Sequence, residues 1–325
     1  MRLVFVVALL QYMGIVSAYA QSPGAPGGYP ARPIRIIVPF SAGAASDFLA
    51  RQLAQKMTES WGQQIVVDNR PSAAGTVAGE IVARATPDGY TLMVTSSAIA
   101  GSAALYPKLP YDTVKDFAPV SMVAVAPVLF VTAPNAGIKT VKDLIAMAKA
   151  KPAHLTFGHS GIGSGTHYAG ELFNVAAGIK TVHVPYRGAA EVLTDAATMR
   201  LSYAIVPMAP AVPLIKGGRV WGIAVTTATR SQSLPDVPTV AESGLPGYRY
   251  DGWFGMFGPG KLPPAIVKQL GTEVARILAL PDVRDRILNL ATTPQTSTPE
   301  ELHQLVRSEI ATRRKIFKDV AAQPQ

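Results

Sequence analysis

The feature of this chain that most constrains its fold is a pattern that occurs twice: an apolar strand, a loop rich in small and polar residues, and a helix start. The first copy runs from Ile36 through the loop 41–47 to Phe48, and the second runs from Leu155 through the loop 158–167 to Tyr168. Backbone N–H groups and the positive end of the helix dipole make each helix start a natural anion site. Two such loops predict two lobes that close on one small anion.

The N-terminus is typical of an exported protein. Residues 1–20 combine a positive charge at Arg2, an apolar segment and the small-x-small sequence Ala18-Tyr19-Ala20, which predicts a signal peptide cleaved after Ala20 and a periplasmic location. The apolar run is shorter than the roughly 20 residues that a membrane span needs. The proline- and glycine-rich residues 21–31 predict a flexible leader.

The absence of cysteine and the distribution of charge exclude several classes of function. A chain without cysteine cannot use thiol catalysis, disulfides or a thiolate metal site. The formal net charge of +9 falls to +8 when Arg2 is removed with the signal. Because the basic residues are scattered, we expect no nucleic-acid partner, and we expect the cluster Arg313-Arg314-Lys315 to be the solvated face of a helix. A positive field suits small anions.

Strand and helix signals alternate along the mature chain, which predicts βαβ units and parallel sheets. The expected strands are Ile34–Phe40, Gln64–Asp68, Tyr90–Thr95, Leu155–Phe157, His183–Pro185, Leu201–Val206, Val220–Thr226 and Trp253–Phe257. The expected helices are Phe48–Met57, Val77–Ala85, Thr140–Ala150, Tyr168–Ala176 and Ala189–Ala197, with two closing helices after Pro264 and after Thr298.

These elements predict an α/β fold of two lobes, with a ligand cleft at the carboxyl ends of the strands. The apolar segment Val120–Thr132 is long enough to be a strand that passes from one lobe into the other. We expect lobe 1 to contain residues 32–125 and 225–325, and lobe 2 to contain residues 126–224.

A secreted serine hydrolase is the alternative from another class. It would use Ser160 or Ser164 with His159 or His167, but neither serine lies in a Gly-x-Ser-x-Gly sequence. No carboxylate lies beside these histidines at metal-ligand spacing, and His183, like the two remaining histidines, is isolated in the sequence. We therefore expect no catalytic residue and no metal site, and a structural or surface role for all five histidines.

Motifs that follow one another along nearly all of the mature chain narrow the class further. They are Pro33–Phe40, Val67–Pro71 with Gly75-Thr76, Pro87–Leu92, Leu109–Asp112, Lys115–Val120, Ala169–Phe173, His183–Gly188, Leu234–Val240 and Trp253–Gly255. In this order they resemble the Bug (TctC-like) family, the extracytoplasmic solute receptors of tripartite tricarboxylate transporters.

The resemblance implies a type II-like Venus-flytrap binding protein that holds a small carboxylate, uses no cofactor and delivers its ligand to membrane permease subunits. We expect it to act as a monomer. A ligand-sensing partner of a membrane signalling protein remains the other role open to such a receptor.

In the family, the two loops hold the ligand carboxylate largely through backbone amides and ordered water. The positions implied in the first lobe are Phe40, Ser41, Ala42, Gly43, Ala44, Ser46 and Asp47. Those implied in the second lobe are Ser160, Gly163, Ser164, Gly165, Thr166 and His167, and Ser96 and Ser97 would form a further wall. We expect Gly165→Val to abolish binding while leaving the fold intact.

The chain departs from the family pattern where it would touch the ligand. Its first loop keeps one glycine, and the methyl groups of Ala44 and Ala45 restrict the approach of an anion to the backbone. Pro207-Met208-Ala209-Pro210 forms a less polar wall than is usual. Asp47 could be a structural cap of the helix or a partner of the helix dipole in its first turn, or it could face the cleft and repel a second ligand carboxylate. These departures predict a monocarboxylate with an apolar or aromatic body.

Overall fold

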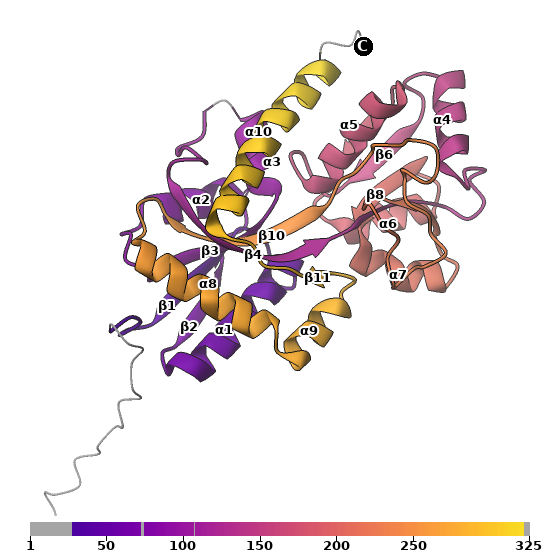
Figure 1. The fold of residues 1–325 in the computed structure, drawn as a ribbon. Helices are drawn as coiled ribbons and strands as arrows, with labels where there is room; N and C mark the ends of the chain where they lie inside the picture. Colours follow the sequence, from indigo (N-terminus) through magenta and orange to yellow (C-terminus); the bar gives the residue numbers. More distant parts are fainter. Residues whose placement is uncertain (1–27, 73–74, 107, 322–325) are drawn as a thin grey trace, which may run out of the picture.

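The computed structural model describes residues 28–72, 75–106 and 108–321, which form two β-sheets with helices packed on them (Figure 1). The expected signal peptide and most of the expected leader lie outside the described residues. The strands are β1 (Ile34–Val38), β2 (Ile65–Asn69), β3 (Thr91–Ser96), β4 (Phe117–Ala126), β5 (Val128–Thr132), β6 (Thr156–His159), β7 (Val182–Pro185), β8 (Tyr203–Pro207), β9 (Trp221–Val225), β10 (Gly252–Pro259) and β11 (Thr293–Pro294). The helices are α1 (Ala45–Trp61), α2 (Thr76–Ala83), α3 (Ala98–Leu105), α4 (Val141–Ala150), α5 (Gly165–Ala177), α6 (Ala189–Ala197), α7 (Met208–Lys216), α8 (Pro264–Leu278), α9 (Pro281–Leu288) and α10 (Pro299–Ala321).

The first sheet has the strand order β11-β4-β10-β3-β1-β2. β1 pairs in parallel with β2 and β3, so Ile36 lies opposite both Val67 and Leu92. β10 runs antiparallel between β3 and β4. Buried residues of α1 and α8 belong to one core of this sheet, and those of α2, α3 and α10 belong to the other. Because both faces are covered, β1 is an almost uninterrupted apolar run.

The second sheet has the strand order β7-β6-β8-β5-β9. β6 pairs in parallel with β7 and β8, and β5 pairs antiparallel with β8 and β9. One core contains Phe130, Phe157 and Phe173 with residues of α4 and α5, and the other contains Leu129 and residues of α6 and α7. The parallel strands β6 and β8 end at the same edge of this sheet, so the segments that follow them are neighbours.

The expected crossing strand over Val120–Thr132 is confirmed as two consecutive strands in different sheets. β4 ends at Ala126 in the first sheet, and β5 begins at Val128 in the second. Pro127 separates them because proline has no N–H with which to continue a ladder. Figure 1 shows this connection beside β10, where the two bodies of the molecule meet.

The return of the chain to the first sheet lies later than the sequence suggested. Val240, Tyr248 and Tyr250 belong to a core of the second sheet, although residues from 225 onward were expected in lobe 1. An isolated parallel bridge joins Val225 to Thr239 and continues this packing. We propose that the chain returns to lobe 1 at β10, and the other lobe boundaries stay predictions.

Three helices were not predicted from the sequence. α3 is built from alanine, glycine and serine with few large apolar residues, so it lacks a clear apolar stripe. α7 contains Pro210 and Pro213, which argue against a helix interior. α9 begins at Pro281, close behind α8, so that three helices and not two follow β10. Met208 begins α7 and is buried in the second sheet's core, so the expected apolar wall loses this side chain.

Helix α10 joins the two halves of the molecule. Leu302 and Ile310 pack in a core of the first sheet, whereas Ile316 packs in a core of the second. Arg313 is fully buried between them, which contradicts its expected place on a solvated face. Its guanidinium forms an ion pair with Glu309 at 2.8 Å and lies over the Tyr168 ring, with Cζ 4.5 Å from the ring centroid. This pairing and stacking compensate the buried charge.

The end of the expected leader also belongs to the fold. The Tyr29 hydroxyl donates a hydrogen bond to the Gly89 carbonyl at 2.7 Å. The Tyr29 ring packs edge-on against Trp61 and Tyr90. The prediction of a flexible leader through residue 31 is therefore wrong at Tyr29, because a buried and hydrogen-bonded aromatic side chain anchors the backbone there.

Candidate ligand-binding site

The loops singled out in the sequence lie at the carboxyl ends of parallel strands, where ligands bind in open α/β sheets. β1 and β3 are neighbours, which brings the loop 39–44 close to Ser96 and Ser97. Phe40, Gly75 and Ala98 line one small cavity with other residues of the first sheet. The start of α2 therefore joins the loops after β1 and β3, although sequence reasoning did not include Gly75 in the site.

The first loop is exposed, and its helix begins without a cap. Ser41, Ala42 and Gly43 are exposed to solvent, and Phe40 and Ala44 are partly buried. α1 begins at Ala45, three residues before the expected start, and its N-cap Ala44 provides no side-chain hydrogen bond. The first N–H groups of the helix therefore lack an intrahelical or capping partner, which is the condition for binding an anion.

Asp47 has the structural role that was one of the two possibilities left open. Its side chain is 4% exposed and accepts hydrogen bonds from the Gly43 N–H at 2.9 Å and from Arg51 Nε at 3.0 Å. Burial would raise the pKa of this carboxyl, but the hydrogen bonds from Arg51 and Gly43 hold it below its usual range. Asp47 and the buried Ser46 lie inside the first turn, so neither is the N-cap.

Ser96 and Ser97 are engaged within the protein. Ser96 Oγ accepts a hydrogen bond from the Ala98 N–H at 3.3 Å. Ser97 Oγ shares a hydrogen bond of 2.8 Å with the Tyr250 hydroxyl, which belongs to the second half of the molecule. Ser97 thus contributes to the junction between the two halves of the molecule.

The second loop is stabilised by its own hydroxyl groups. Ser164 is the N-cap of α5, and its Oγ accepts a hydrogen bond from the His167 N–H at 3.2 Å. Thr166 Oγ1 lies 2.9 Å from Ser164 Oγ and accepts a hydrogen bond from the Ser160 N–H at 3.0 Å. Ser160 Oγ is the exception, because it is buried and has no hydrogen-bond partner among the described residues. A buried hydroxyl without a partner is uncommon in a native protein, and a bound ligand or water is one way to satisfy it.

Gly163 and Gly165 lie at a packed junction, which contradicts the expectation that Gly165→Val leaves the fold intact. A Cβ on Gly165 would lie 2.2 Å from the Tyr250 hydroxyl oxygen. A Cβ on Gly101 of α3 would lie 2.0 Å from the Gly163 carbonyl oxygen. Gly165→Val would therefore disturb the packing of the fold itself, and its effect on binding could not be separated from that disturbance.

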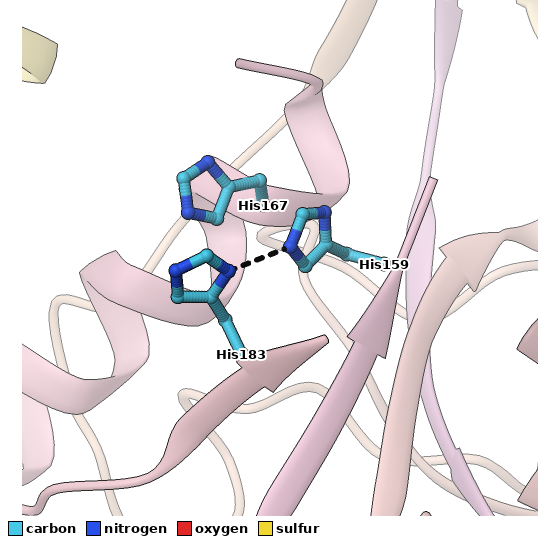
Figure 2. Close-up of side chains that lie close together, drawn as sticks. All are labelled: His159, His167 and His183. Atoms are coloured by element: carbon cyan, nitrogen blue, oxygen red, sulfur yellow. Dashed lines mark hydrogen bonds between the residues drawn. The ribbon is translucent and has the colours of Figure 1, made fainter. Parts of the chain in front are cut away.

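His167 is buried and lies beside two other histidines, as Figure 2 shows. Its Nδ1 accepts a hydrogen bond from the Gly163 N–H at 3.2 Å. The ring stacks on His159 at a centroid distance of 4.5 Å, and His183, isolated in the sequence, completes the group. Sequence reasoning missed this meeting because His183 comes from another strand, and only the pairing of β6 with β7 brings it near.

The side chains do not form a hydrolase triad in the described residues. Ser164 Oγ bonds to Thr166 and to a backbone N–H, and Ser160 Oγ has no partner, so neither serine is bonded to an imidazole. Burial lowers the pKa of His159 to about 4 and that of His167 to about 2. Imidazoles with such pKa values are weak bases, which argues against activation of a serine.

Tyr250 and Arg313 were also missed. Tyr250 packs edge-on against Tyr168 at a centroid distance of 5.5 Å, and Arg313 Nη2 lies 3.4 Å from the Tyr250 hydroxyl oxygen. These groups hold the start of α5 against α10 and Ser97. A single arginine inside a basic run gave no sequence signal of burial, because the run reads as an exposed helix face.

Comparison with known proteins identifies the family. The model of the TctC family, described as the tripartite tricarboxylate transporter family receptor, matches residues 49–321. BugT of Bordetella pertussis is 33% identical over 306 residues, which cover 93% of this chain and 94% of BugT. A UPF0065 protein of Pseudomonas sp., from the tcbD-tcbE intergenic region, is 35% identical over 282 residues, which cover 86% of this chain and 84% of that protein. The chain belongs to the TctC family of receptors, as its motifs predicted.

Solved structures confirm the fold class of a two-lobe periplasmic binding protein. An R. palustris protein solved with adipate has a TM-score of 0.81 and 34% identity, covering 91% of this chain and 100% of that one. MatC from Rhodopseudomonas palustris, solved with bound malate, has a TM-score of 0.78 and 32% identity, covering 89% and 99%. Within the described residues, no helix combines the length and apolar character needed to span a membrane.

Proposed function

We propose that this chain is a periplasmic solute receptor that binds a small organic carboxylate at the loops after β1, β3 and β6. It acts as a monomer and delivers the ligand to the membrane permease subunits of a tripartite transporter. The description of its family supports transport over signalling. The relatives solved with adipate and malate support a carboxylate ligand. The observation that carries the proposal is the uncapped N-terminus of α1, which follows the exposed residues Ser41 to Gly43 after β1.

The ligand carboxylate is held by the first N–H groups of α1 and by the exposed backbone from Ser41 to Gly43. Ser160 Oγ, which has no partner within the described residues, donates a hydrogen bond from the second loop. The negative charge of Asp47 does not repel the ligand carboxylate, because Arg51 pairs with the Asp47 carboxylate at 3.0 Å. The ligand thus meets backbone dipoles from one lobe and a hydroxyl from the other.

The ligand class is wider than the sequence suggested. The argument against a second carboxylate depended on a free charge at Asp47, and this charge is engaged by Arg51. We propose that monocarboxylates and small dicarboxylates both fit, whereas tricarboxylates are disfavoured by the methyl groups of Ala44 and Ala45. No described residue of the first loop offers a cation for a third carboxylate, and Arg51, in helix α1, is already paired with Asp47.

Isothermal titration of the mature protein with adipate, malate, benzoate and citrate tests this proposal. Ser160→Ala should weaken binding of the tightest ligand about 10- to 150-fold, since a hydrogen bond to a charged group contributes about 1.5–3 kcal/mol. Ser308→Ala, on the exposed face of α10, is the matched control and should leave the affinity unchanged. Absence of carboxylate binding would refute the function, and equal affinity in Ser160→Ala would refute this site.

The ligand is bound without chemical change, and no cofactor takes part. After incubation with the protein, NMR should recover the carboxylate unaltered. A serine-directed fluorophosphonate should label neither Ser160 nor Ser164. Covalent labelling of either serine would favour the hydrolase.

Export with cleavage after Ala20 completes the proposal. Mass spectrometry of protein from the periplasm should find Gln21, or its cyclised form, at the N-terminus. A mature chain that retains Arg2 would contradict it.

A further inference from the structure

Three histidines from three different elements meet on the second half of the molecule. His159 ends β6, His167 lies in the first turn of α5, and His183 lies on the edge strand β7. One ring nitrogen from each lies within 4.8 Å of the others, as Figure 2 illustrates. The carboxylate site proposed above uses none of these side chains, although the family resemblance implied a ligand contact at His167.

The hydrogen bonds of His159 prepare it as a metal ligand. Its Nδ1 lies 2.9 Å from the Gly161 carbonyl oxygen, which can only accept, so Nδ1 carries the proton. Its Nε2 lone pair is then directed at His183 Nδ1, 3.1 Å away. A backbone carbonyl that fixes the proton on one nitrogen is the usual support of a metal-binding histidine, and a metal bound at Nε2 would replace the hydrogen bond to His183.

The surroundings suit a cation. Glu171 is buried with Oε1 3.8 Å from His167 Nε2, which places a carboxyl group beside the rings. The buried cation Arg313 is paired with Glu309 at 2.8 Å. His183 is exposed, so an ion can enter from solvent.

We propose that His159, His167 and His183 bind a divalent transition-metal ion of the Zn²⁺ type. Three imidazoles are the donor set of zinc sites that keep a fourth position for water or another ligand, and they do not suit the oxygen-seeking ions Mg²⁺ and Ca²⁺. This proposal replaces the expectation, made from the sequence, that the chain has no metal site.

Binding requires a small contraction of the site. Zn–N bonds of about 2.0–2.1 Å in a tetrahedron place the nitrogens about 3.4 Å apart. The stacked rings of His159 and His167 must turn toward a common point, and His183 on its edge strand can follow. Coordination through His167 Nδ1 replaces the hydrogen bond from Gly163, which is long at 3.2 Å. The bound ion would tie the loop 160–164 to β7 and stiffen it.

Titration with Zn²⁺ tests the site in the mature chain, without a histidine tag, after dialysis against a chelator. Calorimetry should show one ion per chain, Co²⁺ should give the visible absorption of a tetrahedral site, and Mg²⁺ should not bind. His183→Ala removes an exposed ligand and should weaken Zn²⁺ binding at least about 100-fold, beyond what outer-shell changes cause. His154→Ala, which removes an exposed histidine outside the cluster, is the matched control and should bind like the wild type.

NMR of the histidine ring protons in the wild type provides a measurement that needs no variant. Zn²⁺ should shift the signals of His159, His167 and His183 and leave those of His154 and His303 in place. Absence of Zn²⁺ binding, or unchanged affinity in His183→Ala, would overturn the proposal. Because no carboxylate is present in these experiments, their failure would leave the proposed receptor function untouched.

Discussion

The two glycine-containing loops share one sequence pattern but reach different structures. The loop 39–44 exposes Ser41, Ala42 and Gly43 and leads into a helix with no side-chain cap. The loop 160–164 ends in a helix capped by Ser164 and packs its backbone against α3. The same pattern therefore provides free N–H groups in one lobe and a packed junction in the other. The two loops differ in the N-cap residue, which is Ala44 in the first and Ser164 in the second. They also differ in which atoms lie close to the glycines Gly43 and Gly165.

Gly43 of the first loop and Gly165 of the second are needed for different reasons. Gly43 has a positive φ of 84°, and a Cβ built on it meets nothing within 4 Å, so it is needed for its backbone conformation. Gly165 has no such φ, but a Cβ there would collide with Tyr250. The first glycine permits a turn, and the second permits a close approach.

The largest expected effect comes from breaking the junction of the second loop. Gly101→Val places a side chain against the Gly163 carbonyl oxygen, which a Cβ would approach to 2.0 Å. We expect the free energy of unfolding, measured by guanidinium titration, to fall by about 3 kcal/mol, the upper range for overpacking. Gly188→Ala is the control, because a Cβ there meets nothing within 4 Å. Equal stability of Gly101→Val and the wild type would show that the two halves do not pack as described.

The second largest effect is expected from removing the charge of Asp47, whose carboxylate accepts a hydrogen bond from Gly43 in the first loop. Asp47→Asn removes the ion pair with Arg51 and should cost about 2 kcal/mol of unfolding free energy. Because the folded-state pKa of Asp47 is lowered, its contribution is present above the unfolded pKa of about 3.9 and is lost as the pH falls through the folded value. Between pH 3 and pH 7, the free energy of unfolding of Asp47→Asn should therefore depend less steeply on pH than that of the wild type. Glu80→Gln, in the more exposed pair with Arg84, should change little.

A smaller effect is expected from removing the cap of the second loop. Ser164→Ala leaves the His167 N–H without its 3.2 Å hydrogen bond and should lower stability by about 1 kcal/mol. Thermal unfolding followed by circular dichroism measures the change. Ser233→Ala, at a partly buried serine outside α5, serves as the control. A loss no greater than that of the control would mean that the cap contributes nothing.

The smallest effect is expected from adding a side-chain cap to α1, the helix that follows the first loop. Ala44 has the extended conformation of an N-cap, with φ −68° and ψ 159°, so Ala44→Ser should cap α1 and add about 0.5–1 kcal/mol of stability. The same change occupies an N–H group proposed for the ligand, so calorimetry should show weaker carboxylate binding. Greater stability with undiminished affinity would show that these N–H groups do not hold the ligand.

Much of the fold could be predicted from the sequence because it depends on local patterns. Ile34–Val38 is apolar except for Arg35 because both faces of its sheet are covered, and the capping box of Thr140 and Asp143 forms as predicted. The strand crossing near Pro127 follows from the length of its apolar run. The family could also be recognised, because its motifs are short and ordered along the chain.

The tertiary structure decided what depends on distant partners. The burial of Arg313 requires Glu309 and Tyr168 to pair with and stack on it, and the packing role of Gly165 requires Tyr250, 85 residues later in the chain. The meeting of His183 with His159 follows from the register of two parallel strands. Sequence patterns record which elements form and which face of each is apolar. They do not record which side chains meet when two sheets pack together, because those contacts depend on the path of the whole chain.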